Sequence, residues 1–304
     1  MKMVISGATG LVGSALRDAL LAEGGHSVAR LTRPGAKAVA GDIRWDPAAG
    51  TIDLVPLEGA DAVVNLNGAS IGERRWTPER KNLLRSSRVD STRVLVDALA
   101  RLGRKPSVFV SASAIGFYGS RGDELLTEAS ASGGDFLAGL ASDWEAEARR
   151  AEASGIRTVM ARFGIILSAN GGALPRMLTP FKLGAGGRLG SGKQWMSWVA
   201  LDDVVNAIRA AISNQQLRGA VNVVAPNPVR NVEFTSVLAK FLHRPAIFPA
   251  PAFALRLALG EMADALLLSS QRVQPEKLIA AGYQFRLPHV EATLRAALSS
   301  AEKR

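Results

Sequence analysis

The sequence predicts an α/β fold, a Rossmann-type doubly wound parallel sheet joined to a smaller, mostly helical substrate-side lobe. Short apolar runs alternate with helical patterns through the first two thirds of the 304 residues, which is typical of parallel strands linked by crossover helices. Gly7, Gly10 and Gly13 lie between the first apolar run and the first helical pattern. From Ser168 onward, a glycine-rich segment and a largely helical tail replace the alternation.

The first strand should end at Gly7, because a helical pattern of apolar residues follows it. Gly7 permits the turn, Gly10 lets backbone amides approach a pyrophosphate, and Gly13 allows the helix to pack closely on the strand. The phosphate would lie at the positive end of the helix dipole. An ordinary glycine-rich turn is the alternative, but the position between strand and helix favours a dinucleotide site. The helical pattern comprises Val12, Ala15, Leu16, Ala19 and Leu20.

A second strand over residues 27–33 predicts which cofactor is bound. The end of this strand meets the adenosine ribose, where a carboxylate suits NAD and an arginine suits the 2′-phosphate of NADP. The chain has Thr32 and Arg33 there, with Arg30 nearby and no carboxylate before Asp42. The cofactor should therefore be NADP, because a guanidinium binds phosphate in a two-point contact. Alternatively, Arg33 is simply a solvent-exposed residue of a turn.

The rest of the chain continues the alternation. We expect strands over 107–113, 158–165 and 221–225, and over 61–69 a strand that runs into a loop of small residues. One long helix should span 78–102, and another 137–154. Residues 198–204 should form a strand that leads into a helix, and residues 168–195 should form an irregular functional loop or lid. The Rossmann domain would comprise 1–165 and 197–225, and the substrate-side lobe 166–196 and 226–304.

Composition excludes several classes of function. The chain has no cysteine, and His26, His243 and His289 are far apart, so we expect no disulfide, no thiolate catalysis and no metal site. The net charge of +10 comes from arginines spread along the chain, which suits anionic small ligands better than nucleic acid. The first strand begins directly at the N-terminus and no membrane span is apparent, so we expect a cytoplasmic protein. The oligomeric state stays open.

Several stretches together resemble the extended, epimerase-like short-chain dehydrogenase/reductases. The similarity is greatest to an atypical branch named for nucleoside-diphosphate-sugar epimerases, which carries a C-terminal domain of unknown function. The matching pieces include GATGLVG at 7–13, LTR at 31–33, NLNGA at 65–69, RRWTPERKNLLRSSRVDSTRVL at 74–95, SASAIGFYG at 111–119, DFLAGLASDWEAEA at 135–148 and GSGKQWMSWVALDDV at 190–204.

The resemblance implies which residues would hold NADP. Arg88 stands where extended relatives carry an asparagine that faces the cofactor, four residues before Thr92. The pyrophosphate would contact Gly7, Thr9, Gly10, Leu11, Val12 and Gly13, and the 2′-phosphate would contact Thr32 and Arg33. The adenine and ribose side would contact Leu66, Asn67, Gly68 and Ala69. Arg88, Ser111 and Ile165 complete the set of residues expected to bind the cofactor.

The resemblance also exposes a departure in the catalytic residues. Epimerases of this superfamily use a Ser or Thr at the end of the fifth strand and a Tyr-x-x-x-Lys pair on the next helix. Ser113 matches the first position. If Glu145 marks the helix register, Leu137 and Ala141 occupy the tyrosine and lysine positions. A register shifted by one turn would bring Asp143 or Trp144 forward instead.

Tyr118, in the loop after the strand, is the remaining proton donor by residue type, and Arg88 could supply the cation that helps it. The alternative role of Tyr118 is aromatic packing. Trp195 and Trp198 would line the substrate side of the site or, alternatively, pack in the core between the two lobes.

These residues predict an NADP(H)-dependent oxidoreductase of the epimerase-like branch that lacks the usual Tyr-x-x-x-Lys pair. Its substrate would be a small, anionic, sugar-nucleotide-like molecule. The alternative is a non-catalytic NADP(H)-sensing regulatory protein that binds a partner. It is motivated by a chain that lacks the catalytic Tyr and Lys but keeps the glycine turn for the cofactor phosphates.

Overall fold

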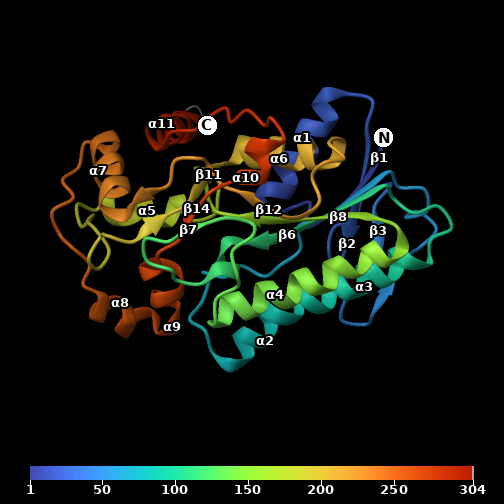
Figure 1. The fold of residues 1–304 in the computed structure, drawn as a ribbon, viewed down its shortest axis with the longest axis horizontal. Coiled ribbons are helices and arrows are strands. Elements are labelled where there is room, and N and C mark those ends of the chain that lie inside the picture. Colours follow the sequence, from blue (N-terminus) through green and yellow to red (C-terminus); the bar gives the residue numbers. More distant parts are fainter. Residues whose placement is uncertain (303–304) are drawn as a thin grey trace.

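The computed structural model describes residues 1–302 and contains one large sheet (Figure 1). Its strands lie in the order β12-β8-β6-β5-β1-β2-β3-β4, and every neighbouring pair is parallel except β3 with β4. The strands are β1 (Lys2–Ser6), β2 (Ser27–Thr32), β3 (Ile43–Asp46), β4 (Thr51–Ile52), β5 (Ala62–Asn65), β6 (Val108–Ala114), β8 (Arg157–Phe163) and β12 (Gly219–Val223).

Helices cover both faces of this sheet, as Figure 1 shows. Met3 and Ile5 of β1 pack with α1 (Leu11–Glu23) and α6 (Leu201–Ser213), whereas Val4 packs in a second core with α3 (Val89–Arg101). The helix α4 (Phe136–Arg149) lies beside α3. Burial on both faces explains why the strands are continuous apolar runs rather than alternating ones. The predicted doubly wound α/β fold is confirmed.

A third hydrophobic cluster joins several of the remaining segments. Trp198 lies in it with side chains from α5 (Leu174–Lys182), α7 (Asn231–Leu242) and α11 (Val290–Glu302). The other elements are short: α2 (Pro78–Ser86), β7 (Leu125–Leu126), β9 (Ile165–Leu167), β10 (Trp195–Met196), β11 (Trp198–Ala200), β13 (Val229–Arg230), α8 (Ala252–Leu259), α9 (Glu261–Ala263), β14 (Arg272–Val273) and α10 (Glu276–Ala280). β9 and β11 form their own parallel pair outside the large sheet. The domain boundaries given above remain a prediction.

Two local predictions were wrong, and one extension of the sheet was missed. The helix expected over 78–102 is two helices, α2 and α3, which are separated at Ser87 and Arg88. The segment expected to be irregular over 168–195 contains α5, which buries Leu174, Leu178 and Phe181 and begins with a proline in its first turn. The short strands β3 and β4, which extend the sheet beyond β2, were not predicted.

Candidate functional site

The turn between β1 and α1 needs glycine for steric reasons. Gly7 has φ +67°, and a Cβ there would lie 2.5 Å from the carbonyl oxygen of Leu66. A Cβ on Gly13 would lie 2.2 Å from the carbonyl oxygen of Gly7. The turn therefore packs its backbone directly against the end of β5 and the first turn of α1, as the glycine pattern predicts.

The N-terminus of α1 is open to a ligand. Gly10 is the N-cap residue and provides no side-chain cap, and the first turn carries no acidic residue. The Gly10 N–H donates to the Gly7 carbonyl at 3.0 Å, whereas the N–H groups of Leu11 and Val12, two half-buried residues, have no acceptor among the described residues. α6 differs, because Asp202 and Asp203 occupy its first turn. The unneutralised end of α1 fits the pyrophosphate of a dinucleotide.

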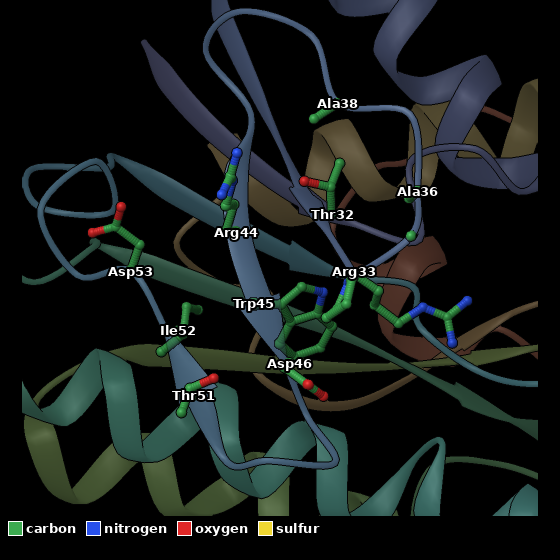
Figure 2. A pocket seen from close by; sticks show the side chains of 12 residues that line it. Thr32, Arg33, Ala36, Ala38, Arg44, Trp45, Asp46, Thr51, Ile52 and Asp53 are labelled. Carbon is green, nitrogen blue, oxygen red and sulfur yellow. The ribbon is translucent and has the colours of Figure 1, made fainter.

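A pocket of about 670 Å³ lies at the end of β2 and is bordered by the β3–β4 hairpin (Figure 2). Thr32 and Arg33 line it, with Thr32 buried and Arg33 exposed. Arg30 is paired with Asp42, whereas Arg33 makes no ion pair with any described residue. Of the arginines at this strand end, Arg33 is thus the one free to bind a phosphate.

The loop that follows β5 is tied to the break between α2 and α3. Asn67 Nδ2 donates to the carbonyl of Ser87 at 3.1 Å, and the Ala69 N–H donates to Ser87 Oγ at 3.0 Å. Leu66, Asn67 and Ala69 are half-buried and Gly68 is exposed, so this loop lines the sheet edge next to the glycine turn. The helix break therefore serves to anchor a loop of the predicted cofactor site.

Arg88 lies at this helix break as a largely buried cation. Its guanidinium donates to the carbonyls of Ala69 and Leu84 at 2.9 and 3.1 Å and lies 5.4 Å from the ring centroid of Trp144. No carboxylate among the described residues pairs with it. Burial, followed by the charge of Arg80, lowers the pKa of Arg88 to about 10. Its positive charge is therefore uncompensated.

A buried polar network connects β6, α4, β8 and β12. Ser113 Oγ donates to Glu145 Oε1 at 2.7 Å, and Arg162 Nε and Nη2 each donate to Glu145 at 2.7 Å. Arg162 Nη1 donates to the hydroxyl of Tyr118 at 2.9 Å, and that hydroxyl donates to Asn222 Oδ1 at 2.7 Å. No residue of this network is more than 3% exposed.

This network changes the role expected for Tyr118. The side chain is fully buried, its hydroxyl proton is given to Asn222, and the cation beside it is Arg162 rather than Arg88. Burial raises the pKa of Tyr118, although Arg162 and Asn222 oppose the shift. The arrangement favours the alternative interpretation, in which Tyr118 is a packing residue and leaves no hydroxyl hydrogen for a substrate.

Glu145, Ala141 and Leu137 lie on one buried face of α4, as their spacing of four residues requires. Leu137 packs with Leu140 and Trp144 in an apolar cluster and contacts the segment that follows β6. This wall of the site thus carries no proton-transferring side chain at the Leu137 and Ala141 positions.

The other two residues assigned to the cofactor lie at different depths. Ser111 is fully buried and accepts a hydrogen bond from Asn65 Nδ2 at 3.4 Å, next to Ser6 and Thr92. Ile165 is half-buried at the start of β9. Their contact with a cofactor stays a prediction.

The two tryptophans have different surroundings. Trp198 is fully buried, and its indole N–H donates to the carbonyl of Asn227 at 3.2 Å, which favours the core-packing interpretation. Trp195 is half-buried, and the guanidiniums of Arg230 and Arg272 lie 4.6 and 4.8 Å from its ring centroid. Arg272 Nε is buried without a hydrogen-bond partner.

Asp123 is the carboxylate of this cluster. It accepts hydrogen bonds from Trp195 Nε1 at 2.7 Å and from Arg230 Nη2 at 2.9 Å. Two guanidiniums and one carboxylate leave an excess positive charge around the Trp195 ring. The segments that carry Trp195 and Arg272 are also joined directly, since the Gln271 N–H donates to the Trp195 carbonyl at 3.1 Å.

Sequence reasoning missed the roles of Glu145, Arg162 and Asn222. Glu145 served only to mark the helix register, and the other two were not singled out. Arg162 had a signal in the sequence, because it directly follows the apolar residues 159–161 of a predicted strand, where a charged side chain requires a buried partner.

Within residues 1–302, no helix combines the length and apolar character needed to cross a membrane, and no group of three metal-ligating side chains is present.

Comparison with known proteins places these features in a family context. Residues 3–224 match the model of the NAD dependent epimerase/dehydratase family, and residues 250–297 match a domain of unknown function, DUF1731. An epimerase family protein of Mycobacterium bovis, Mb2239, is 44% identical over 283 residues, which cover 93% of each chain. The epimerase family protein YfhF of Bacillus subtilis is 38% identical and covers 97% of each chain.

Two solved structures show the same fold. Human epimerase family protein SDR39U1, solved with NADPH, superposes with a TM-score of 0.89 at 32% identity and covers 98% of this chain and 99% of its own. UDP-glucuronic acid 4-epimerase from Bacillus cereus, solved with NAD, gives a TM-score of 0.78 at 16% identity and covers 100% of this chain and 97% of its own, a likeness of fold alone.

Proposed function

Since this chain belongs to the NAD dependent epimerase/dehydratase family, we propose that it is an NADP(H)-dependent oxidoreductase or epimerase-like enzyme that acts on a small anionic molecule. The observation that carries the cofactor assignment is the uncapped N-terminus of α1 beside the pocket lined by Thr32 and Arg33. The NADPH bound to the human relative supports it. A cytoplasmic location is part of the same proposal.

The chain's own residues would bind the cofactor in two places. Backbone N–H groups at the start of α1 would donate to the pyrophosphate, where no side chain competes for them. Arg33 would donate to the 2′-phosphate, and the Thr32 hydroxyl would add a donor by giving up its long hydrogen bond of 3.4 Å to the Ile43 carbonyl. When bound, the nicotinamide ring supplies the hydride acceptor or donor.

Ser113 would orient the oxygen of the reacting group. Its hydroxyl hydrogen is donated to Glu145, so the lone pairs of Oγ remain free to accept from a substrate hydroxyl. Arg162 holds Glu145 through two hydrogen bonds and thereby fixes the direction of the Ser113 hydroxyl. Tyr118 acts through Arg162 as a positioning residue in this proposal.

The cluster around Trp195 supports an anionic substrate. Arg230 and Arg272 bring more positive charge than Asp123 neutralises, and the buried Nε of Arg272 has no acceptor. Guanidinium groups bind carboxylates and phosphates in two-point contacts. Sugar nucleotides, which carry a pyrophosphate, are one class with the required charge.

Calorimetric titration of NADPH and NADH tests the cofactor assignment. NADPH should bind more tightly, and Arg33→Ala should weaken NADPH binding by about ten- to a hundred-fold, since it removes a charge-assisted contact. Equal affinities of the two cofactors for the unmodified protein would contradict the assignment.

A second experiment tests turnover by following absorbance at the reduced-nicotinamide band with a panel of carbonyl compounds and sugar nucleotides as substrates. Tight NADPH binding with no turnover of any of them would support the sensing alternative.

A further inference from the structure

We propose that Arg44 of β3 is a second ligand of the NADP 2′-phosphate, so that two arginines from neighbouring strands together select NADP(H) over NAD(H). This inference rests on the proposed NADP(H) function and names a residue for which the sequence pattern at the end of β2 gives no signal.

The register of the sheet places Arg44 at the site. β2 and β3 are parallel, and Thr32 is the direct partner of Arg44 across them. Both residues line the pocket of about 670 Å³ together with Arg33. Figure 2 shows Arg44 and Arg33 on opposite sides of Thr32. A phosphate near the Thr32 hydroxyl would therefore have a guanidinium available on each side.

The pairing of the charged side chains in the pocket supports this role. Asp46 and Asp53 also line the pocket with their negative charges, and their carboxylates accept hydrogen bonds from the nearby backbone N–H groups of Ala48 and Val55 rather than from an arginine. Neither carboxylate forms an ion pair with Arg33 or Arg44, and both arginines are exposed and unpaired among the described residues.

The neighbouring pair behaves differently. Arg30 of β2 and Asp42, the residue before β3, neutralise each other, with Arg30 Nε 2.8 Å from Asp42 Oδ1. Two guanidiniums without an ion-pair partner among the described residues thus remain for a group that carries close to two negative charges. NAD(H) has a 2′-hydroxyl in place of this phosphate, so the two arginines would add little to its binding.

The experiment compares NADPH and NADH binding by calorimetry for the unmodified protein and for Arg44→Ala, Arg33→Ala and the double variant. Arg44→Ala should weaken NADPH binding by about tenfold and leave NADH binding within about twofold. The double variant should bind the two cofactors with similar affinity. Arg101→Ala is the charge-matched control, because Arg101 is exposed at the end of α3 and does not line the pocket.

The outcomes separate this inference from the proposed function. If the unmodified protein prefers NADPH and Arg44→Ala weakens NADPH no more than Arg101→Ala does, the assignment of Arg44 is wrong and the NADP(H) function stands. An equal loss of NADPH and NADH affinity in Arg44→Ala would also overturn it. If the unmodified protein shows no preference, the proposed cofactor itself is wrong. Thermal unfolding followed by circular dichroism verifies that each variant is folded.

Discussion

Ser113 at the end of β6 donates its hydroxyl hydrogen to Glu145 of α4 over 2.7 Å, and each of the two residues is 2% exposed. The same carboxylate receives two hydrogen bonds from Arg162 of β8. One acidic side chain thus joins a helix to two strands of the sheet. It also determines which way the Ser113 hydroxyl points.

Replacing Glu145 should be far more damaging than replacing Ser113. Glu145→Gln leaves the buried Arg162 charge without its partner and should lower the free energy of unfolding by about 3–5 kcal/mol. Ser113→Ala removes one hydrogen bond and should cost about 1 kcal/mol. Urea denaturation measures both. Asp143→Asn is the control, since its ion pair with Arg85 is exposed and should contribute less than about 1 kcal/mol. Equal losses for Glu145→Gln and Ser113→Ala would contradict the network.

Neither tyrosine should ionise at its ordinary pH in the folded protein. The chain has two tyrosines, and burial raises the pKa of both Tyr118 and Tyr283 above 10. The unfolded chain therefore releases these protons first, and the free energy of unfolding should fall as the pH rises past about 10. Ultraviolet difference absorbance should show no tyrosinate step near pH 10 before unfolding. A reversible step there, with the fold intact, would contradict the raised pKa values of the two tyrosines.

Alanine at two glycines should have opposite effects. In Gly13→Ala the new Cβ would meet the Gly7 carbonyl oxygen at 2.2 Å, so the variant should lose about 1–3 kcal/mol of stability and bind NADPH more weakly. Gly139 lies within α4 with open space around its Cβ position, so Gly139→Ala should gain about 0.5–1 kcal/mol and leave NADPH binding unchanged. Denaturation and calorimetry check both. A Gly13→Ala variant with normal stability and affinity would show that the turn tolerates a side chain.

Limited digestion with trypsin should begin after Lys182 or Arg188. Both are exposed, at the end of α5 and in the glycine-rich segment that follows it, and Leu183 between them is 79% exposed. NADPH or substrate should slow the cleavage if this segment closes over the site. Mass spectrometry of the first fragments identifies the cut. A first cut at Arg17 or Arg30, in the Rossmann core, would contradict this order of stability.

The features predicted correctly from the sequence are those with local causes. Gly7, Gly10 and Gly13 are constrained by one turn, so their spacing alone predicted the strand, the turn and the helix. The helix break at Ser87 and Arg88 was missed, because it depends on hydrogen bonds to residues 67–69 rather than on a proline or glycine. β3 and β4 are too short to show a clear period.

The buried network could not be predicted for a related reason. Tyr118 and Asn222 are 104 residues apart in the chain, and their hydrogen bond follows from the order of strands in the sheet. By residue type Tyr118 suggested a proton donor, and only its long-range partners show that its hydroxyl is already engaged. Trp195 and Trp198 illustrate the same limit, since they are three residues apart, yet Trp195 is half-buried and Trp198 fully buried.

The position of β12 at the edge of the sheet has a consequence for the synthesis of the protein. β1 through β8 leave the ribosome first, but Asn222, which accepts the Tyr118 hydrogen bond, belongs to β12 and is translated about a hundred residues after Tyr118. Until then the Tyr118 hydroxyl lacks its acceptor, and the open edge of β8 lacks its neighbouring strand. A nascent chain stalled before residue 219 should thus expose the unpaired backbone N–H and C=O groups of β8, to which chaperones can bind.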